Sequence, residues 1–349
     1  MKVVRCEKNP LISPENVKPS REDFRVDGIF NCGVAKYGDE IILLCRVAES
    51  VACDPSEVKI PIVVKENQTE IVTLVKKEHP EMDFSDSRSV RMDGKTIYLT
   101  SLSHLRIARS RDGINFHVED EPFVFPNAEE ESWGMEDPRI TQIEDTYYIN
   151  YTSVTSHGAA TSLLTTKDFK TCIRKGVIFA PENKDVTIFP EKINGKYMAF
   201  NRPVPCGIGN PDIWIAESLD LVHWGNQKYF CGISETSSWE NGRIGGGAVP
   251  FKTSEGWVKI YHGADKDGRY CLGAFLLDLN DPSRVLAKTR EPVLQPEADY
   301  EKYGFFNNVV FTCGCVLEDN NVIIYYGAAD DKICRADIKL CDLLEELRT

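Results

Sequence analysis

The sequence predicts an all-β protein, a five-bladed β-propeller with a short C-terminal helix. Two observations lead to this prediction. A strand–turn–strand unit recurs along the 349 residues, and several copies are followed by a second unit of strand, polar turn and aromatic residue. Recurrence of one strand unit is typical of a propeller, in which each copy contributes part of a blade.

The first unit is a hairpin, and six segments fit it. They are residues 32–44, 89–99, 139–148, 189–199, 249–260 and 314–324. Their turns include Asp-Gly, Asn-Gly and Asn-Asn, which favour the tight turns that join antiparallel strands. The spacing of about 50 to 65 residues is long for a blade but is compatible with blades that carry long loops.

Residues 50–88 interrupt this spacing and contain the charged run Lys76-Lys77-Glu78. We interpret them as an insertion, with residues 50–105 elaborating the first blade. Five blades then remain, and six blades is the alternative. No linker or low-complexity stretch divides the chain, so residues 1–349 are expected to form a single domain.

The second unit covers residues 107–116, 164–169 and 215–224 and predicts the outer hairpin of a blade. Helix is expected only over residues 336–349. There Leu340, Leu343, Leu344 and Leu347 repeat at the i, i+3, i+4, i+7 spacing of one apolar helix face. This face packs either on its own domain or on a second copy of the chain, so a homo-oligomer remains open.

The composition limits the class of protein. The net charge of −13 argues against nucleic acid or an anionic membrane as the partner. The chain opens without the apolar core of a signal peptide, and no run approaches a membrane span. The twelve cysteines lack paired C-x-x-C motifs, which predicts mostly buried, reduced thiols, no metal site and a cytoplasmic location.

Polar clusters stand where the repeated strands end, and in a propeller such positions can converge on the axis. They are Asn31 with Arg46, Glu136-Asp137-Pro138-Arg139, Lys184-Asp185 with Arg202, Tyr261-His262-Gly263 and residues 326–331. This mixture of acids, cations and aromatic rings suits a sugar. One carboxylic acid near a glycosidic oxygen can supply the proton that bond cleavage needs.

These motifs resemble glycoside hydrolase family 130, the mannoside phosphorylases and related mannosidases. The matching pieces run in family order across roughly residues 28–335. They are residues 29–34, 136–141, 188–197, 201–203, 244–247, 256–263 and 325–330. The opening residues 8–14 and the segment 101–106 look closer to members that act on β-1,2-linked mannosides.

The resemblance implies a five-bladed propeller and an inverting mechanism. Asp137 matches the proton donor, which in this family is thought to act through a hydroxyl of the mannosyl unit. Inorganic phosphate then attacks the anomeric carbon and gives α-mannose 1-phosphate, reversibly. Phosphate is a co-substrate, so no cofactor is implied. The matched phosphate-binding positions are Lys184, Arg202 and His262, and those that hold the mannosyl unit are Asn31, Arg46 and Asp330.

Some residues have a structural interpretation beside the functional one. Asp137 could cap the turn before a strand, and Arg139 is expected to bridge blades through carboxylates. We interpret Gly245-Gly246-Gly247 as a close backbone approach near the axis, because no helix follows to make a nucleotide site. Trp133 could be core or a sugar platform, and His104 and His157 are left unassigned.

Three other functions compete with a β-mannoside phosphorylase. A mannosidase of the same family would use water and would not need the cationic set. A non-catalytic sugar-binding propeller would not need the acid and the cations together. A mannosyltransferase that uses a nucleotide sugar also remains open. The sequence does not decide the linkage, the acceptor sugar, the chain length or the oligomeric state.

Overall fold

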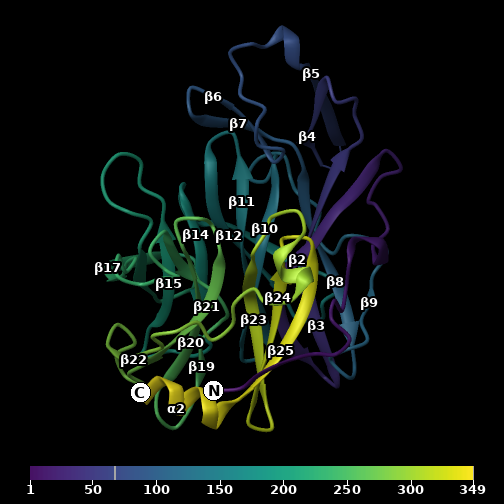
Figure 1. The fold of residues 1–349 in the computed structure, drawn as a ribbon. Helices are drawn as coiled ribbons and strands as arrows, with labels where there is room; N and C mark the ends of the chain where they lie inside the picture. The colour runs from purple at the N-terminus through teal and green to yellow at the C-terminus, as the bar shows by residue number, and fades with distance from the viewer. Residues whose placement is uncertain (67, 349) are drawn as a thin grey trace.

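The computed structural model of the protein describes residues 1–66 and 68–348. Asn67 and Thr349, which fall within the predicted insertion and the predicted terminal helix, lie outside the described residues. Five antiparallel sheets surround a central axis, and each is one blade of a propeller (Figure 1). The prediction of a five-bladed, all-β fold is confirmed.

Three of the blades are built from strands that follow one another in the chain, and in blade 1 the insertion separates the second strand from the third. Blade 1 contains β2 (Phe24–Tyr37), β3 (Glu40–Val51), β8 (Leu102–Ser110) and β9 (His117–Val118). Blade 2 contains β10 (Gly134–Ile143), β11 (Thr146–Thr155), β12 (Gly158–Thr166) and β13 (Ile173–Phe179). Blade 3 contains β14 (Asn183–Ile188), β15 (Tyr197–Pro203), β16 (Ile213–Ser218) and β17 (Trp224–Cys231). Blade 4 contains β18 (Arg243–Gly246), β19 (Phe251–Lys252), β20 (Trp257–Ala264), β21 (Tyr270–Leu277) and β22 (Val285–Lys288).

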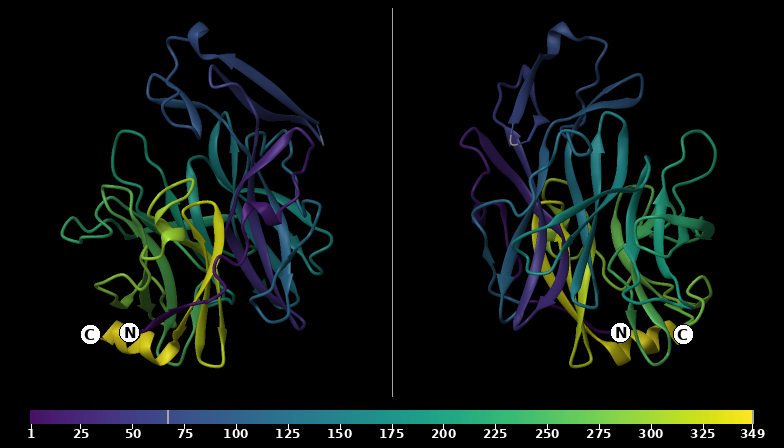
Figure 2. Two further views of the ribbon diagram at one scale, coloured as in Figure 1. Left: turned by 45° about the vertical axis from the view of Figure 1, so that its right-hand side comes forward. Right: turned by 180° about the vertical axis from the view of Figure 1, so that it is seen from behind.

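The fifth blade joins the two ends of the chain. It contains β23 (Val310–Glu318), β24 (Asn321–Ala328), β25 (Lys332–Lys339) and β1 (Val3–Arg5). β1 pairs antiparallel with β25, with Val3 opposite Ile338. The first strand of the chain therefore completes the last blade, and both termini lie at the same end of the propeller (Figures 1 and 2).

Five of the six predicted hairpins lie in blades, and the sixth does not. Residues 89–99 form β6 (Ser89–Met92) and β7 (Lys95–Leu99), which make a separate two-stranded sheet. A second small sheet contains β4 (Glu57–Lys65) and β5 (Gln68–Val75), followed by the 3-10 helix η2 (Lys76–Glu78). Both sheets stand above the propeller, at the end opposite the termini (Figures 1 and 2). The insertion therefore reaches from the end of β3 to the start of β8, beyond the predicted residue 88.

The tight turns behave as their residues predict. Asp93 and Gly94, and also Asn194 and Gly195, all have positive φ angles between 51° and 79°. Two successive positive φ values are the mark of the type I′ turn, whose twist matches that of the strands it joins. Local turn chemistry thus sets the hairpins in both the propeller and the insertion.

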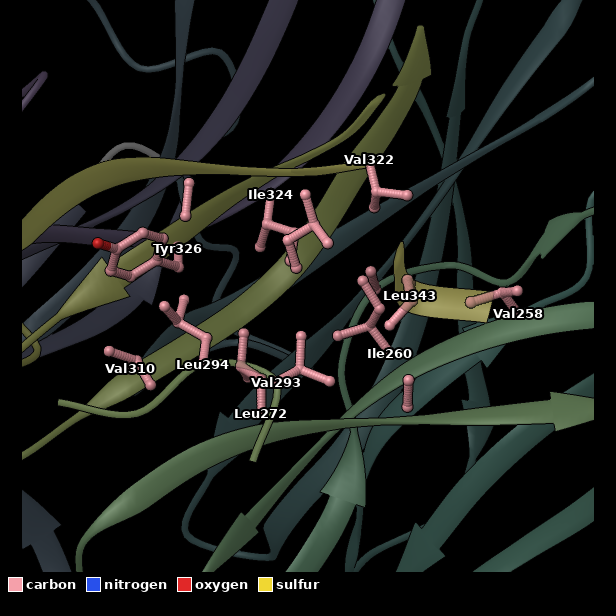
Figure 3. Packing of buried hydrophobic residues seen from close by; sticks show 14 of the residues in the cluster. Val258, Ile260, Leu272, Val293, Leu294, Val310, Val322, Ile324, Tyr326 and Leu343 are labelled. Carbon is pink, nitrogen blue, oxygen red and sulfur yellow. The ribbon is translucent and has the colours of Figure 1, made fainter. Parts of the chain in front are cut away.

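The C-terminal helix α2 (Leu340–Arg348) begins four residues later than predicted, because residues 336–339 still belong to β25. Its side chains Leu343, Leu344 and Leu347 are buried in an apolar cluster between blades 4 and 5. Figure 3 shows Leu343 beside Val258, Ile260 and other members of this cluster. The apolar face of the helix is therefore covered by its own chain. The other short helices are η1 (Pro14–Asn16) and α1 (Asp299–Lys302).

All twelve cysteines are free thiols. Only five of them are buried, namely Cys32, Cys45, Cys271, Cys313 and Cys334, so the expectation that most are buried is wrong. Among the described residues, no helix is long and apolar enough to cross a membrane.

Candidate active site

One cavity of about 580 Å³ brings together all seven residues proposed from the sequence, and its lining comes from all five blades and the insertion. The predicted residues that line it are Asn31, Arg46, Asp137, Lys184, Arg202, His262 and Asp330. They are up to about 300 positions apart in the sequence, so only folding around an axis can gather them.

β-Bulges position the residues that point toward the axis. The pairing of the first strand with the second is interrupted after Phe30 in blade 1, after Glu136 in blade 2 and after Lys184 in blade 3. The next residue in each case, Asn31, Asp137 or Asp185, has a positive φ of 48°, 50° or 57°. Asn and Asp tolerate this left-handed conformation better than other non-glycine residues. A bulge re-aims side chains, and here it does so at equivalent positions of three blades.

Asp137 is held through one of its two carboxylate oxygens. Its Oδ1 accepts hydrogen bonds from Asn31 Nδ2 at 3.0 Å and from Arg46 at 3.1 Å. Its Oδ2 has no hydrogen-bond partner among the residues that the structure describes. The side chain is therefore oriented by two neighbours and retains one oxygen for a proton and a substrate hydroxyl, as a general acid requires.

Arg46 connects the acids of this part of the cavity. Its guanidinium donates to Glu136 at 2.8 Å, to Asp137 at 3.1 Å and to Ser103 Oγ at 3.1 Å. It also lies over the Phe30 ring, 4.8 Å from the centroid. These contacts leave it little freedom and fix the Glu136 and Asp137 carboxylates relative to each other.

The three carboxyl groups around Arg46 have different electrostatic environments. Burial alone would raise the pKa of Glu136, but Arg46 and Lys184 outweigh it and lower this pKa to about 2. Burial raises the pKa of Asp330 to about 7, against the opposing effect of Arg46. Glu136 is therefore ionised at neutral pH, whereas Asp330 retains its proton to a higher pH than an ordinary carboxyl group, and its protonated form can donate as well as accept a hydrogen bond.

The predicted phosphate-binding residues Lys184, Arg202 and His262 line the same cavity. Lys184 Nζ lies 3.3 Å from Glu136, and Arg202 Nε donates to Asp185 at 2.6 Å. The two terminal nitrogens of Arg202 have no hydrogen-bond partner within residues 1–66 and 68–348. The guanidinium is thus anchored at its inner edge and has two free donors, the arrangement that suits a bidentate contact with phosphate.

His262 is buried and is neutral at pH 7. Burial lowers its pKa to about 3, although Asp185 acts to raise it. Its Nδ1 lies 3.0 Å from the Gly246 carbonyl oxygen and so carries the proton of the neutral ring. Its Nε2 can then accept a hydrogen bond from a P–OH group. The predicted set therefore contains two permanent cations and one imidazole, rather than three cations.

Arg139 has the structural role that the sequence suggested. It is buried and donates to the carbonyl oxygens of Asp137, Gly246 and Gly247 and to the Asp185 carboxylate. It thereby ties blades 2, 3 and 4 together beneath the cavity. Gly247 permits close backbone packing against β20, because a Cβ atom there would lie 2.7 Å from the Ile260 carbonyl oxygen.

A family comparison is consistent with this site. The family model Glyco_hydro_130, described as beta-1,4-mannooligosaccharide phosphorylase, matches residues 88–348. The chain belongs to glycoside hydrolase family 130. It is 49% identical over 351 residues to a Beta-1,2-mannobiose phosphorylase of Listeria innocua, covering 99% of each chain. It is 43% identical to a 1,2-beta-oligomannan phosphorylase of Thermoanaerobacter, covering 69% of this chain and 80% of the relative.

A solved structure extends the comparison to three dimensions. The Listeria innocua Beta-1,2-Mannobiose phosphorylase in complex with beta-1,2-mannobiose superposes with a TM-score of 0.96 at 48% identity. The match covers 100% of this chain and 99% of the other. It therefore includes the first 87 residues, which the family 130 model does not match and which supply Asn31 and Arg46 to the cavity.

Sequence reasoning missed several residues of the family 130 cavity. Glu136 and Asp185 stand beside predicted residues in clusters that the sequence did reveal, but they were not assigned to the site. Arg88, Arg243, Tyr270 and Phe306 also line the cavity, and no local pattern marked them. Arg88, from the insertion, forms an ion pair with Asp86 and lies over the Phe306 ring at 4.7 Å.

Trp133, His104 and His157 do not line this cavity. Trp133 packs against Tyr98 of the insertion, with ring centroids 6.1 Å apart. His104 is buried beside Glu49, and His157 is exposed in the turn between β11 and β12. Among the described residues, no group of three or more His, Cys, Asp or Glu side chains is arranged to hold a metal ion.

Proposed function

We propose that this protein is an inverting β-mannoside phosphorylase, which cleaves β-mannosides with inorganic phosphate to give α-mannose 1-phosphate. The observation that carries the proposal is a single cavity in which Asp137 has a free carboxylate oxygen and Arg202 has two free donors. The names of the relatives from Listeria and Thermoanaerobacter support the same reaction.

Asp137 supplies the proton and phosphate supplies the nucleophile. The acid donates its proton towards the departing glycosidic oxygen, through a hydroxyl of the mannosyl unit as the family resemblance implies. The bond from the anomeric carbon to that oxygen breaks while a phosphate oxygen forms a new bond on the opposite face. The products are the shortened sugar and α-mannose 1-phosphate, and Asp137 regains a proton from solvent. Asn31, Arg46 and Asp330 hold the mannosyl unit.

Phosphate needs no separate base, because it is already an anion at neutral pH. It needs donors that match its oxygens, and Lys184, Arg202 and His262 supply them. A hydrolase would instead need a residue that activates water. The two free donors of Arg202 are better matched to phosphate than to water, so we favour phosphorolysis over the mannosidase alternative.

The linkage is proposed as β-1,2. The Listeria relative, matched over almost the whole chain, and the Thermoanaerobacter relative carry this linkage in their names, although the family model is described by β-1,4-linked substrates. The acceptor side would be shaped by the insertion, which contributes Arg88 and Arg91 to a second cavity of about 280 Å³ that shares Arg46, Glu136 and Asp330 with the first.

One assay tests the reaction and the linkage together. The protein is incubated with β-1,2-mannobiose or β-1,4-mannobiose, with and without phosphate, and the products are identified by chromatography and phosphorus NMR. We expect α-mannose 1-phosphate from the β-1,2-linked sugar only when phosphate is present. Equal release of mannose without phosphate would contradict phosphorolysis, and preference for the β-1,4-linked sugar would contradict the linkage.

A cytoplasmic location is part of the proposal. Twelve unpaired thiols, three of them exposed, are typical of a reducing compartment. The oligomeric state stays a prediction that sedimentation or light scattering can decide.

A further inference from the structure

Asp185 is a buried carboxylate within the candidate phosphate site, where a negative charge opposes the binding of an anion. It is only 5% exposed, and it sits in the bulge of β14 next to Lys184. A buried carboxylate is unfavourable unless it is paired, so its partners indicate why it is there.

Three cationic or protonatable side chains from three blades share this carboxylate. Its Oδ1 lies 3.3 Å from Arg139, and its Oδ2 accepts a hydrogen bond from Arg202 Nε at 2.6 Å. His262 Nε2 lies 3.5 Å from the same Oδ2. Coulombic attraction, chiefly from Arg202 and also from Arg139, overcomes the effect of burial and holds the pKa of Asp185 far below its ordinary value. Asp185 is therefore ionised at neutral pH, where His262 is itself neutral.

The contact with Arg202 determines which donors remain. Nε is occupied by Asp185, whereas the two terminal nitrogens meet no acceptor in the described part of the chain. A planar guanidinium fixed at one edge presents its other donors in a defined direction. Without Asp185 the side chain could rotate about its stem and lose that direction.

His262 is oriented by the same arrangement. Its Nδ1 is fixed by the Gly246 carbonyl, which also accepts a hydrogen bond from Arg139. Gly245 has no side chain to separate Asp185 from His262, since a Cβ atom there would lie 2.5 Å from His262 Nε2 and in close contact with Asp185 Oδ2. Asp185, Arg139 and Gly245 thus form one support beneath Arg202 and His262.

We infer that the Asp185 carboxylate is a positioning residue, which holds Arg202 and His262 in the orientation in which they bind and align phosphate. This inference rests on the proposed function, because it concerns the alignment of phosphate for attack. Asp185 does not touch the reacting atoms itself. It acts through Arg202 and His262, and its negative charge opposes the binding of the anion that they align.

The decisive variant is Asp185→Asn, because it distinguishes the effect of Asp185 on the orientation of phosphate from the effect of its negative charge on phosphate affinity. Loss of the negative charge favours phosphate binding, whereas loss of the anchor misaligns it. We expect kcat to fall by about a hundredfold, the size of effect that a 1 Å misplacement can produce. The dissociation constant for inorganic phosphate, measured by calorimetry, should change by less than about tenfold, since the two effects on affinity oppose each other.

Glu301→Gln is the matched control. Glu301 is also buried and paired with an arginine, Arg5, but it does not line the cavity. Both variants should lose thermal stability, and only Asp185→Asn should lose turnover. If Asp185→Asn keeps kcat within threefold, its role is merely structural. If kcat is unchanged and phosphate binds more tightly, Asp185 acts only as a charge. Either result would overturn the inference.

Gly245→Ala disturbs the contact between Asp185 and His262 while the Asp185 charge is retained. It replaces Asp185→Asn as the test if that variant does not fold. The added methyl should push Asp185 and His262 apart and lower kcat at least tenfold. Gly225→Ala is its control, because a Cβ atom at Gly225 meets nothing within 4 Å. A Gly245→Ala protein that turns over like the Gly225→Ala protein would contradict the inference.

The double variant Asp185→Asn with Arg202→Ala tests whether Asp185 acts through Arg202. Because Asp185 acts partly through Arg202, the kcat loss of the double variant should be smaller than the product of the two single losses. Losses that multiply would show that Asp185 does not act through Arg202. The wild-type assay keeps the two proposals apart. Failure to form α-mannose 1-phosphate would refute the proposed function, whereas wild-type phosphorolysis with an unaffected Asp185→Asn variant would refute only this inference.

Discussion

The two halves of the cavity are built on different principles. In the acid half, formed by Asn31, Arg46, Glu136, Asp137 and Asp330, Arg46 pairs with two carboxylates and fixes both. In the cation half, formed by Lys184, Arg202, Arg243 and His262, each side chain is held by a contact with another residue of the protein. Arg202 has two free donors, and Arg243 donates to the Tyr270 hydroxyl but forms no ion pair within residues 1–66 and 68–348.

This difference matches the proposed ligands. A mannosyl unit is neutral, so its half can be held rigid by ion pairs before the sugar binds. Phosphate is an anion, so its half retains donors that no described residue occupies, namely the terminal nitrogens of Arg202. The comparison predicts that substitutions in the acid half will impair chemistry or sugar binding, whereas substitutions in the cation half will act on phosphate.

The largest effect is expected from Asp137→Asn in the acid half. The amide retains the size of the side chain but cannot donate the carboxylic proton. Turnover should fall by at least the range of about 10² to 10⁴ that general acid catalysis contributes. Steady-state kinetics measures the loss, and Asp145→Asn, an exposed position in the same blade, is the control. A variant within tenfold of wild type would show that another residue donates the proton.

Arg202→Ala should give the next largest effect, and it should be specific to phosphate. A hydrogen bond to a charged group is worth roughly 1.5 to 3 kcal/mol, so kcat/KM for phosphate should fall about tenfold to a hundredfold. The KM for the mannoside should change far less. Titration of each substrate against the variant checks this. Weakened sugar binding with an unchanged phosphate KM would assign Arg202 to the acid half.

Asp330→Asn tests the electrostatics of the acid half through stability. The pKa of Asp330 is raised to about 7 by burial, so the folded protein retains a proton that the unfolded chain loses near its ordinary pKa of 3.8. The free energy of unfolding contributed by Asp330 therefore falls as the pH rises from about 4 to about 7. The amide does not titrate, so the variant should gain stability relative to wild type across this window, by up to about 1.4 kcal/mol per pH unit.

Urea denaturation of both proteins at about pH 5, 6 and 7 measures this difference. Glu136 is present in both proteins, so its titration in the unfolded chain cancels in the comparison, and its folded-state pKa of about 2 lies below the window. His262 titrates in both proteins and cancels in the comparison. A difference in stability that stays constant with pH would show that Asp330 is ionised throughout.

The features that could be predicted from the sequence are those that depend on residues close together in the chain. Turn residues fixed the hairpins, and the polar residues at strand ends pointed to one site. Residues 89–99 have the same turn chemistry as a blade hairpin, yet within the described part of the chain they join no blade: β6 pairs with β7, and an isolated bridge links Arg91 to Asp83. Local sequence does not reveal which strands a hairpin will meet, so the limits of the insertion could not be predicted.

The missed site residues have a physical explanation. Neighbours in a regular strand point to opposite faces, so Glu136 would be expected to point away from a site that contains Asp137. The bulges break this alternation, and both members of the pairs Glu136–Asp137 and Lys184–Asp185 line the cavity. No sequence signal marked these bulges. The same geometry that builds the site therefore hid Glu136 and Asp185 from sequence reasoning.

The smallest effect should come from Lys184→Met, which tests whether Lys184 belongs to the cation half or to the acid half. Lys184 Nζ lies 3.3 Å from Glu136 of the acid half, but its side chain is 35% exposed, the most open of the three predicted phosphate residues. Solvent screens an exposed charge, and pairs of this kind are worth about 0 to 1 kcal/mol.

The phosphate KM should therefore rise by less than about fivefold, since 1.4 kcal/mol corresponds to tenfold. The mannoside KM should stay constant, because Arg46 still holds Glu136. If the mannoside KM rises more than the phosphate KM, Lys184 supports sugar binding through Glu136. Lys184 would then belong to the acid half of the cavity.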